Sequence, residues 1–205
     1  SPLARKQLAK LHVYGGGDSV CLILGDNIFY GYNLGELLRQ SAKLKNGATV
    51  FACLVKDPQR YGVINFGKKR KVVSITEKPK KAKSNWAVSG LYFYDNHVVS
   101  IAKKLKPSSR GELEITGINN EYIRKGKLKV QFLGRGHAWL DTGTYESLID
   151  ASIFIKTIEE RQGLKIGCIE EVAYRMGYIK KAQLLKLAGQ IPTAYGQYLK
   201  DLSNE

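Results

Sequence analysis

The chain has 205 residues, of which 43% are hydrophobic and 25% are charged. This composition supports an apolar core and excludes a largely disordered protein. No apolar run approaches the ~18 residues of a membrane-spanning helix, and the N-terminus carries no signal-peptide pattern. The three cysteines, Cys21, Cys53 and Cys168, stand in apolar segments. They are typical of free thiols in a reducing compartment, so we expect a cytoplasmic protein.

The formal net charge of +15 raises nucleic-acid binding as an alternative function. Residues 68–83 carry eight Lys or Arg against one acidic residue. This basic segment contains no aromatic residue and no recognisable nucleic-acid-binding motif. We therefore expect a solvated hairpin, or a general preference for anionic phosphate ligands, and no nucleic-acid partner.

The N-terminal third predicts a helix, a strand, a helix and a strand. Residues 1–12 fit a short helix, and the glycines at 15–17 form a turn that precedes a strand, whereas a phosphate-binding loop would follow one. The continuous apolar run at 20–24 indicates a strand buried on both faces. A helix at 34–43 and a second buried strand at 48–55 complete a β-α-β order, which predicts a right-handed parallel crossover.

The middle of the chain is rich in β-formers. Residues 62–66 and 72–75 flank a short basic turn, which predicts a hairpin. A further strand is expected at 87–94, followed by helices at 96–105 and 112–124.

The last third begins with a half-exposed strand at 128–132. Thr144 can cap a helix that reaches Gln162, and another helix is expected at 180–187. No linker separates two parts, so the sequence predicts one α/β domain over 1–205, with a β-rich insert and a helical C-terminal part.

Two carboxylates follow apolar runs in distant parts of the chain. Asp26 comes after residues 20–24, and Asp141 ends the stretch at 138–141. Ligands of open α/β sheets bind at the ends of strands, and Mg²⁺ takes one or two carboxylates together with phosphate oxygens and water. The alternative for Asp26 is that it caps a following helix.

Two cations are candidates for phosphate binding. Lys78 stands between Glu77 and Pro79, which restrict the backbone, and Arg110 precedes a predicted helix. The alternatives are a solvated lysine and an ordinary surface arginine. The histidines His12, His97 and His137 have no serine or cysteine partner in a nucleophile motif, so we expect structural roles for them.

Six phrases resemble the sugar-nucleotide nucleotidyltransferases, and among them the glucose-1-phosphate thymidylyltransferases. They occur in the family's order, with further matches at 158–165 and 195–199. The phrases cover residues 24–31, 57–63, 77–79, 90–95, 110–116 and 139–144.

The resemblance implies a Rossmann-like nucleotide-diphospho-sugar transferase fold with a mixed, mainly parallel sheet flanked by helices. It implies Mg²⁺-dependent transfer of a thymidylyl group from dTTP to glucose 1-phosphate, which gives dTDP-glucose and pyrophosphate. This reaction serves the synthesis of dTDP-rhamnose-type sugars and polysaccharides. Family members are homotetramers with a second, regulatory nucleotide site at subunit contacts.

The resemblance also assigns roles to residues. Asp26 and Asp141 would hold Mg²⁺, while Lys78 and Arg110 would hold the sugar phosphate. The sugar pocket would be lined by Tyr61, Gly62, Glu77, Val88 and Trp139. The regulatory nucleotide site would include Tyr30, Gly31 and Arg135.

The sequence departs from the family pattern in two places. The family's triphosphate-binding G-G-x-G-T-R-L loop and its base-selecting segment are not in this sequence, and Gly117 stands where the family has Asp. We therefore expect an N-terminally truncated domain that is weakly active or inactive alone, with the choice between dTTP and UTP open. A non-catalytic regulatory or oligomerisation copy is the alternative.

Overall fold

A computed structural model describes residues 18–108 and 110–205. The chain forms two compact units, one ending at Gly143 and the other beginning at Thr144. Whether both belong to one domain, as the sequence analysis expects, stays a prediction. The predicted helix at 1–12 and turn at 15–17 lie outside the described residues.

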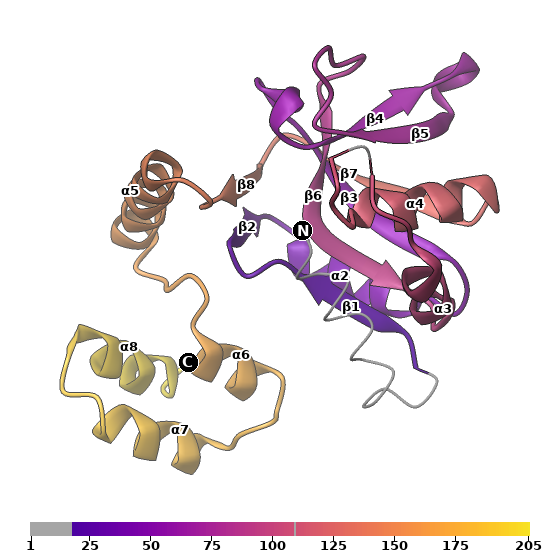
Figure 1. Ribbon diagram of the computed structural model, residues 1–205. Coiled ribbons are helices and arrows are strands. Elements are labelled where there is room, and N and C mark those ends of the chain that lie inside the picture. The colour runs from indigo at the N-terminus through magenta and orange to yellow at the C-terminus, as the bar shows by residue number, and fades with distance from the viewer. Residues whose placement is uncertain (1–17, 109) are drawn as a thin grey trace. The chain divides into compact units, whose positions relative to one another are not determined.

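The first unit contains two sheets. The larger sheet has the strand order β5-β4-β6-β3-β7, and β1 pairs with β6 beside this path (Figure 1). The smaller sheet is the antiparallel pair β2 and β8. The strands are β1 (Val20–Ile23), β2 (Asn27–Gly31), β3 (Ala48–Leu54), β4 (Gly62–Phe66), β5 (Val72–Glu77), β6 (Trp86–Tyr94), β7 (Leu128–Leu133) and β8 (His137–Asp141).

The larger sheet is mixed, and its long strand β6 explains why. Among the described strands, β3 and β7 form the parallel pair, and all other pairs are antiparallel. β1 and β3 each run antiparallel to β6, so they are parallel to each other with β6 between them. The predicted parallel relation of these two strands is thus correct in direction. The sheet contains more antiparallel pairs than expected, because β6 lies between β1 and β3 and pairs antiparallel with both.

The predicted burial holds for β3 but not for β1. Ala48 to Cys53 are all buried in β3. In β1 only Leu22 is buried, while Cys21 and Ile23 are exposed, so the expectation of a strand buried on both faces is wrong there. Among the described strands β1 has β6 as its one neighbour, which leaves its side chains partly uncovered.

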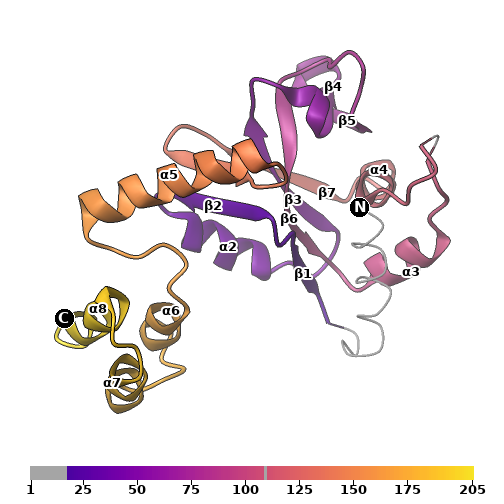
Figure 2. The ribbon, with the colours of Figure 1, turned by 60° about the vertical axis from the view of Figure 1, so that its left-hand side comes forward.

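Helices cover both faces of the larger sheet (Figure 2). The predicted helices appear as α2 (Leu34–Ala42), α3 (His97–Lys104) and α4 (Ile115–Arg124), the last beginning three residues later than expected from Glu112. Short 3-10 turns, η1 (Pro58–Arg60) and η2 (Lys68–Arg70), precede β4 and β5.

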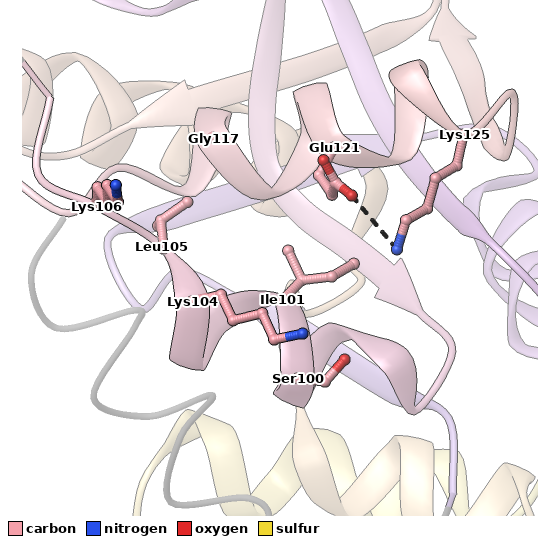
Figure 3. A pocket seen from close by; sticks show the side chains of 8 residues that line it. All are labelled: Ser100, Ile101, Lys104, Leu105, Lys106, Gly117, Glu121 and Lys125. Atoms are coloured by element: carbon pink, nitrogen blue, oxygen red, sulfur yellow. Dashed lines mark ion pairs between the residues drawn. The ribbon is translucent and has the colours of Figure 1, made fainter.

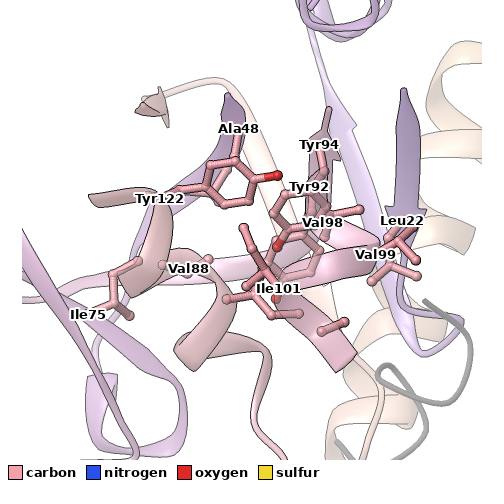
Figure 4. Close-up of a cluster of buried hydrophobic side chains, with 14 of the residues drawn as sticks. Leu22, Ala48, Ile75, Val88, Tyr92, Tyr94, Val98, Val99, Ile101 and Tyr122 are labelled. Atoms are coloured by element: carbon pink, nitrogen blue, oxygen red, sulfur yellow. The ribbon is translucent and has the colours of Figure 1, made fainter. Parts of the chain in front are cut away.

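The alternation of side chains along a strand divides the core between the two faces. Val50 of β3 and Tyr92 of β6 pack with residues of α3 and α4 (Figure 4). Phe51 and Phe93, one position further along, pack on the other side with leucines of α2. Each of these strands therefore contributes to two apolar layers.

Gly117 has a packing reason inside α4. A Cβ atom at this position would lie 2.6 Å from Cδ1 of Leu105. The absence of a side chain lets Leu105 pack directly against the helix. A mid-helix glycine costs ~1 kcal/mol relative to alanine, and this packing contact offsets part of that cost.

The second unit is helical and contains α5 (Tyr145–Gln162), α6 (Ile169–Arg175), α7 (Lys181–Gly189) and α8 (Ala194–Leu202). Thr144 caps α5 as predicted, and its hydroxyl accepts a hydrogen bond from the backbone of Ser147. The helix predicted at 180–187 is confirmed as α7, whereas α6 and α8 were not predicted. Cys168, Leu184 and Leu199 form the centre of a small apolar cluster in this unit.

All three cysteines are free thiols, as expected. Cys53 is buried, and burial raises the pKa of its thiol to about 12, so it stays protonated and unreactive. No helix within the described residues is long and apolar enough to cross a membrane.

Candidate functional site

The small sheet places the two predicted carboxylates beside each other. Asp141 ends β8, and its pairing partner in β2 is Asn27, the residue after Asp26. The backbone N–H and hydroxyl of Thr142 both donate to the carbonyl of Asp26, at 2.8 and 2.9 Å. These bonds hold the two segments together although they are more than one hundred residues apart in sequence.

No helix begins directly after Asp26. Residues Asn27–Gly31 form β2, and α2 begins only at Leu34 with Asn33 at its N-cap. The segment pairs with β8 because Asn27 to Gly31 meet five residues of that strand in register. Asp26 therefore does not cap a helix, and this alternative for its role is excluded.

The side chain of Asn27 connects the small sheet to the larger one. Its Oδ1 accepts from the backbone N–H of Gly90 in β6 at 3.0 Å and from Nε1 of Trp139 in β8 at 2.6 Å. Its Nδ2 donates to Oδ1 of Asp26 at 2.7 Å. A side chain at Gly90 would clash here, since a Cβ would lie 2.5 Å from Oδ1 of Asn27. Asn27 belongs to a recognised phrase, but sequence reasoning did not identify it as a site residue.

Both carboxylates face the space beside Gly143. A Cβ atom on this glycine would lie 3.1 Å from Oδ1 of Asp141 and 3.8 Å from Oδ2 of Asp26. The glycine N–H also donates to Oδ1 of Asp141 at 3.1 Å. Two convergent carboxylate oxygens fit a hard divalent cation that takes its remaining ligands from phosphate and water. The part of the chain that the structure describes has no group of three or more His, Cys, Asp or Glu able to hold a metal.

A cavity of about 190 Å³ opens next to these carboxylates. It brings together most of the residues that the resemblance assigned to the metal and the sugar phosphate. These are Asp26, Tyr61, Gly62, Glu77, Lys78, Val88, Trp139 and Asp141.

Aromatic rings form one wall of this cavity. The ring centroids of Tyr61 and Trp139 are 4.8 Å apart and tilted by 56°. The guanidinium of Arg60 lies 5.5 Å from the Tyr61 ring centroid and pairs with Asp57 at 3.0 Å. Burial raises the pKa of the Tyr61 hydroxyl, and the nearby Asp141 carboxylate raises it further. Arg60 also lines the cavity, and sequence reasoning missed it.

Glu77 also lines the cavity and is held by α4. The hydroxyl of Thr116 donates a short hydrogen bond to Oε2 of Glu77. Gly62 lies against this pair, since a Cβ there would be 3.2 Å from the Thr116 hydroxyl and 3.3 Å from Oε2 of Glu77. Ile115, Thr116 and Asn119 of α4 all line the cavity, and none was among the predicted site residues.

Lys78 has an uncommon backbone conformation. Its φ is 39°, which lies in the left-handed region that few non-glycine residues adopt, and its N–H donates to the carbonyl of Tyr61 at 2.9 Å. Residues held in sparsely populated conformations cluster at functional sites. Lys69 and Arg70 of the same segment also have positive φ, of 54° and 58°. What distinguishes Lys78 among the eight exposed basic residues of 68–83 is that it alone lines this cavity.

Tyr92 adds a neutral hydroxyl to the cavity. Burial raises the pKa of this phenol well above its usual range, and the carboxylates of Glu77 and Asp26 add to the effect. The hydroxyl is therefore protonated and can donate a hydrogen bond at any physiological pH.

Four predicted residues lie outside this cavity. Arg110 is exposed and its closest acidic partner is Glu112 at 3.8 Å. Tyr30 and Gly31 are in β2, and Arg135 is in the turn between β7 and β8. A Cβ on Gly31 would lie 2.5 Å from Cδ2 of His137, so the imidazole packs directly over this glycine.

A second cavity, of about 330 Å³, lies between α3 and α4 (Figure 3). Lys104, Lys106 and the Glu121–Lys125 ion pair line it, with a 3.4 Å separation in the pair. A hydrogen bond from Arg124 and the charges of Arg124 and Lys125 hold the pKa of Glu121 down at about 2. This cavity contains none of the predicted site residues.

Known proteins resemble this chain over most of its length. A family model described as "Nucleotidyl transferase" matches residues 6–158. Glucose-1-phosphate thymidylyltransferase of Neisseria meningitidis is 54% identical over 185 residues, which are 90% of this chain and 64% of that protein. The Mycobacterium tuberculosis protein of the same name is 51% identical over 200 residues, which are 95% of this chain and 69% of that protein. The chain thus spans about two thirds of the length of these relatives.

Solved structures are similar as well. A Bacillus anthracis structure described as a glucose-1-phosphate thymidylyltransferase in complex with sucrose has 42% identity and a TM-score of 0.65. It covers 73% of this chain and 59% of that one. UDP-glucose pyrophosphorylase bound to UDP-glucose has 21% identity and a TM-score of 0.64, covering 75% and 61%. At this identity the second match concerns the fold alone. Together they confirm the expected Rossmann-like, mixed α/β fold.

Proposed function

This chain belongs to the nucleotidyl transferase family, and from that premise we propose that it carries the metal and sugar-phosphate side of a glucose-1-phosphate thymidylyltransferase. The reaction joins dTTP and glucose 1-phosphate into dTDP-glucose and pyrophosphate. The observation that supports it most is the convergence of Asp26 and Asp141 beside Gly143, at a cavity that also contains Glu77 and Lys78. The names of the relatives, at 51–54% identity, supply the substrates.

The reaction exchanges one phosphorus–oxygen bond for another and needs no oxidant or reductant. A phosphate oxygen of glucose 1-phosphate attacks the α-phosphorus of dTTP, and the bond to the bridging oxygen of the β-phosphate breaks. Pyrophosphate leaves with that electron pair. Catalysis of this kind depends on positioning and on neutralising charge, so the residues that hold the two phosphates carry most of it.

Asp26 and Asp141 would hold Mg²⁺, which when bound supplies positive charge to the reacting phosphates. The ammonium group of Lys78 would hold the phosphate of the sugar phosphate. Arg110 would assist it, and because this side chain lies outside the cavity, the turn at Gly111 must bring it closer.

The sugar would lie in the cavity, in contact with the aromatic rings and with Glu77. Tyr61 and Trp139 would cover its apolar face and keep water out, with Gly62 and Val88 leaving room for the ring. Glu77, oriented by Thr116, would accept hydrogen bonds from sugar hydroxyls.

The remaining assignments follow the family resemblance. Tyr30, Gly31 and Arg135 would contribute to a regulatory nucleotide site in a homotetramer. The protein would act in the cytoplasm, with sugar nucleotides and no nucleic acid as partners. The product would feed dTDP-rhamnose-type sugar and polysaccharide synthesis.

A binding experiment on the 205-residue chain tests this proposal separately from turnover. Isothermal titration calorimetry with glucose 1-phosphate, with and without Mg²⁺, should detect binding that Asp26→Asn and Lys78→Gln weaken. Lys81→Gln, an exposed lysine of the same segment, is the matched control. Wild-type protein that shows no heat of binding and no thermal stabilisation by glucose 1-phosphate would contradict the proposed function.

A further inference from the structure

We propose that Asn119 of α4 is a specificity-determining residue that donates a hydrogen bond to one hydroxyl group of the bound hexose phosphate. The inference rests on the proposed function for its substrate class. It assigns to α4 a direct role in choosing the sugar, in addition to its support of Glu77.

The side-chain amide of Asn119 is only half satisfied. The residue is 1% exposed, and its Oδ1 accepts a hydrogen bond from the hydroxyl of Tyr94 at 2.7 Å. Its Nδ2 is buried and has no hydrogen-bond partner among residues 18–108 and 110–205. Buried amide groups almost always have a partner, so an unpaired one indicates a ligand or a bound water that completes it.

The surroundings of Tyr94 fix the direction of this amide. The Tyr94 ring is fully buried and stacks on Tyr92 and Tyr122, with centroid distances of 5.9 and 5.7 Å (Figure 4). The Tyr122 hydroxyl donates to Asp95 at 2.6 Å, which holds the end of the stack in place. The amide therefore cannot rotate away to find another partner, and turning it over would only leave its oxygen unpaired instead.

The unpaired amide belongs to a residue that lines the candidate site. Asn119 lines the same cavity as Glu77 and Asp26, and it stands about one helical turn after Thr116. Thr116 is the residue whose hydroxyl holds the Glu77 carboxylate. Helix α4 thus orients the Glu77 acceptor through Thr116, and it contributes a second lining residue, Asn119, whose amide donor has no partner among the described residues.

This combination suits a hydroxyl group better than a phosphate. A sugar hydroxyl donates one hydrogen bond and accepts others, so it can satisfy a carboxylate and an amide N–H together. A phosphate offers no donor in its ionised form, and the negative charge of Glu77 would repel it. Sites built to bond a substrate hydroxyl reject analogues that lack it much more strongly than apolar pockets reject a change in size.

The test is a titration of glucose 1-phosphate and its four monodeoxy analogues into the full chain in the presence of Mg²⁺. Asn119→Asp keeps the shape of the side chain and an oxygen for Tyr94, but when ionised it cannot donate. Asn120→Asp is the matched control, because Asn120 is the next amide along α4 and bonds the backbone of Ile75 at 2.8 Å instead of lining the cavity. Circular dichroism and thermal unfolding establish that both variants are folded.

We expect one deoxy analogue to bind wild-type protein about tenfold more weakly than glucose 1-phosphate. Asn119→Asp should weaken glucose 1-phosphate by a similar factor and lose discrimination against that analogue, while Asn120→Asp should retain it. Equal discrimination by Asn119→Asp and wild type would overturn this inference and leave the proposed function standing. Wild-type protein that binds none of the ligands would overturn the proposed function itself, and this inference with it.

A measurement on wild-type protein covers the case in which Asn119→Asp does not fold. With asparagine labelled with ¹⁵N, the side-chain NH₂ signals of Asn119 should shift, and exchange more slowly, when glucose 1-phosphate is added. The critical deoxy analogue should leave these signals as they are in the free protein. Signals that respond equally to every analogue would show that a bound water, and not the sugar, completes this amide.

Discussion

Nδ2 of Asn27 donates to Oδ1 of Asp26 at 2.7 Å, while the carbonyl oxygen of the same amide accepts from Gly90 and Trp139. One side chain therefore orients a candidate metal ligand and ties the small β2–β8 sheet to β6. Loss of a partner that orients a metal ligand typically weakens metal binding about 10–100-fold.

Replacing Asn27 by Ala should weaken binding of a divalent cation about 10-fold or more, because Asp26 loses the donor that orients it. The free energy of unfolding should fall by about 1–3 kcal/mol, since the N–H groups of Gly90 and Trp139 lose their acceptor. Mn²⁺ titration followed by water-proton relaxation and urea unfolding measure the two effects. Asn85→Ala, at an exposed position of the same unit, is the control, and equal cation affinity in both variants would contradict the role of Asn27.

Gly143→Ala should also weaken cation binding, by about tenfold, but with little loss of stability. The added methyl would lie 3.1 Å from Oδ1 of Asp141 and enter the space that both carboxylates face. The matched control is Gly134→Ala, where an added Cβ meets nothing within 4 Å. Calorimetric titration with Mg²⁺ or Mn²⁺ compares them, and unchanged affinity in Gly143→Ala would show that the cation does not occupy this space.

Stability should depend on pH through Asp95. Burial alone would raise the pKa of this carboxyl, but hydrogen bonds from Tyr122 and Gly47 outweigh burial and hold the pKa below its usual range. A carboxyl with a depressed pKa in the folded state stabilises the fold above its unfolded pKa of ~3.9, and this contribution is lost as the pH falls toward the folded value.

Asp95→Asn should therefore destabilise the protein at neutral pH, and the difference from wild type should shrink as the pH falls below ~4. Urea unfolding over a pH series measures the difference in the free energy of unfolding. Asp150→Asn changes an exposed carboxylate and should give a small, pH-independent difference. A constant difference for Asp95→Asn as well would rule out this carboxyl as a source of acid sensitivity.

Local sequence patterns predicted the positions of helices and strands better than they predicted which strands pair with each other. The hairpin of β4 and β5 and the cap at Thr144 appear as expected, because each depends on residues close in sequence. The antiparallel position of β6 between β1 and β3 depends on long-range pairing, which hydrophobic periodicity does not encode. Strand β2 at Asn27–Gly31 was not predicted for the same reason, since its partner strand β8 is distant in sequence.

The candidate site divides in a similar way. Charged groups such as Asp26, Asp141 and Lys78 could be predicted because they stand in recognisable phrases. Residues that act by orienting others could not, because an asparagine or threonine carries no signal of which group it bonds. Asn27 and Thr116 were found only from their hydrogen bonds, and Asn119 only from its unpaired amide nitrogen.

Lys78 and Arg110 should differ in their effect on glucose 1-phosphate binding, although the family resemblance gives both the same role. Lys78 already lines the cavity, and the hydrogen bond from its N–H to the Tyr61 carbonyl holds its backbone there, so no backbone movement is needed to reach a bound phosphate. Arg110 lies outside the cavity near Glu112 and must move to reach a phosphate. Calorimetry should show at least a tenfold loss of affinity for Lys78→Gln, since a charge-assisted hydrogen bond contributes about 1.5–3 kcal/mol. Arg110→Gln should cause a smaller loss, because the cost of moving the turn offsets part of its interaction with the phosphate.

Lys81→Gln, which removes an exposed charge from the same basic segment, should change the affinity less than twofold once salt screens the surface. If Lys81→Gln and Lys78→Gln weaken binding equally, the basic segment attracts the ligand only through its overall charge, and Lys78 has no specific role.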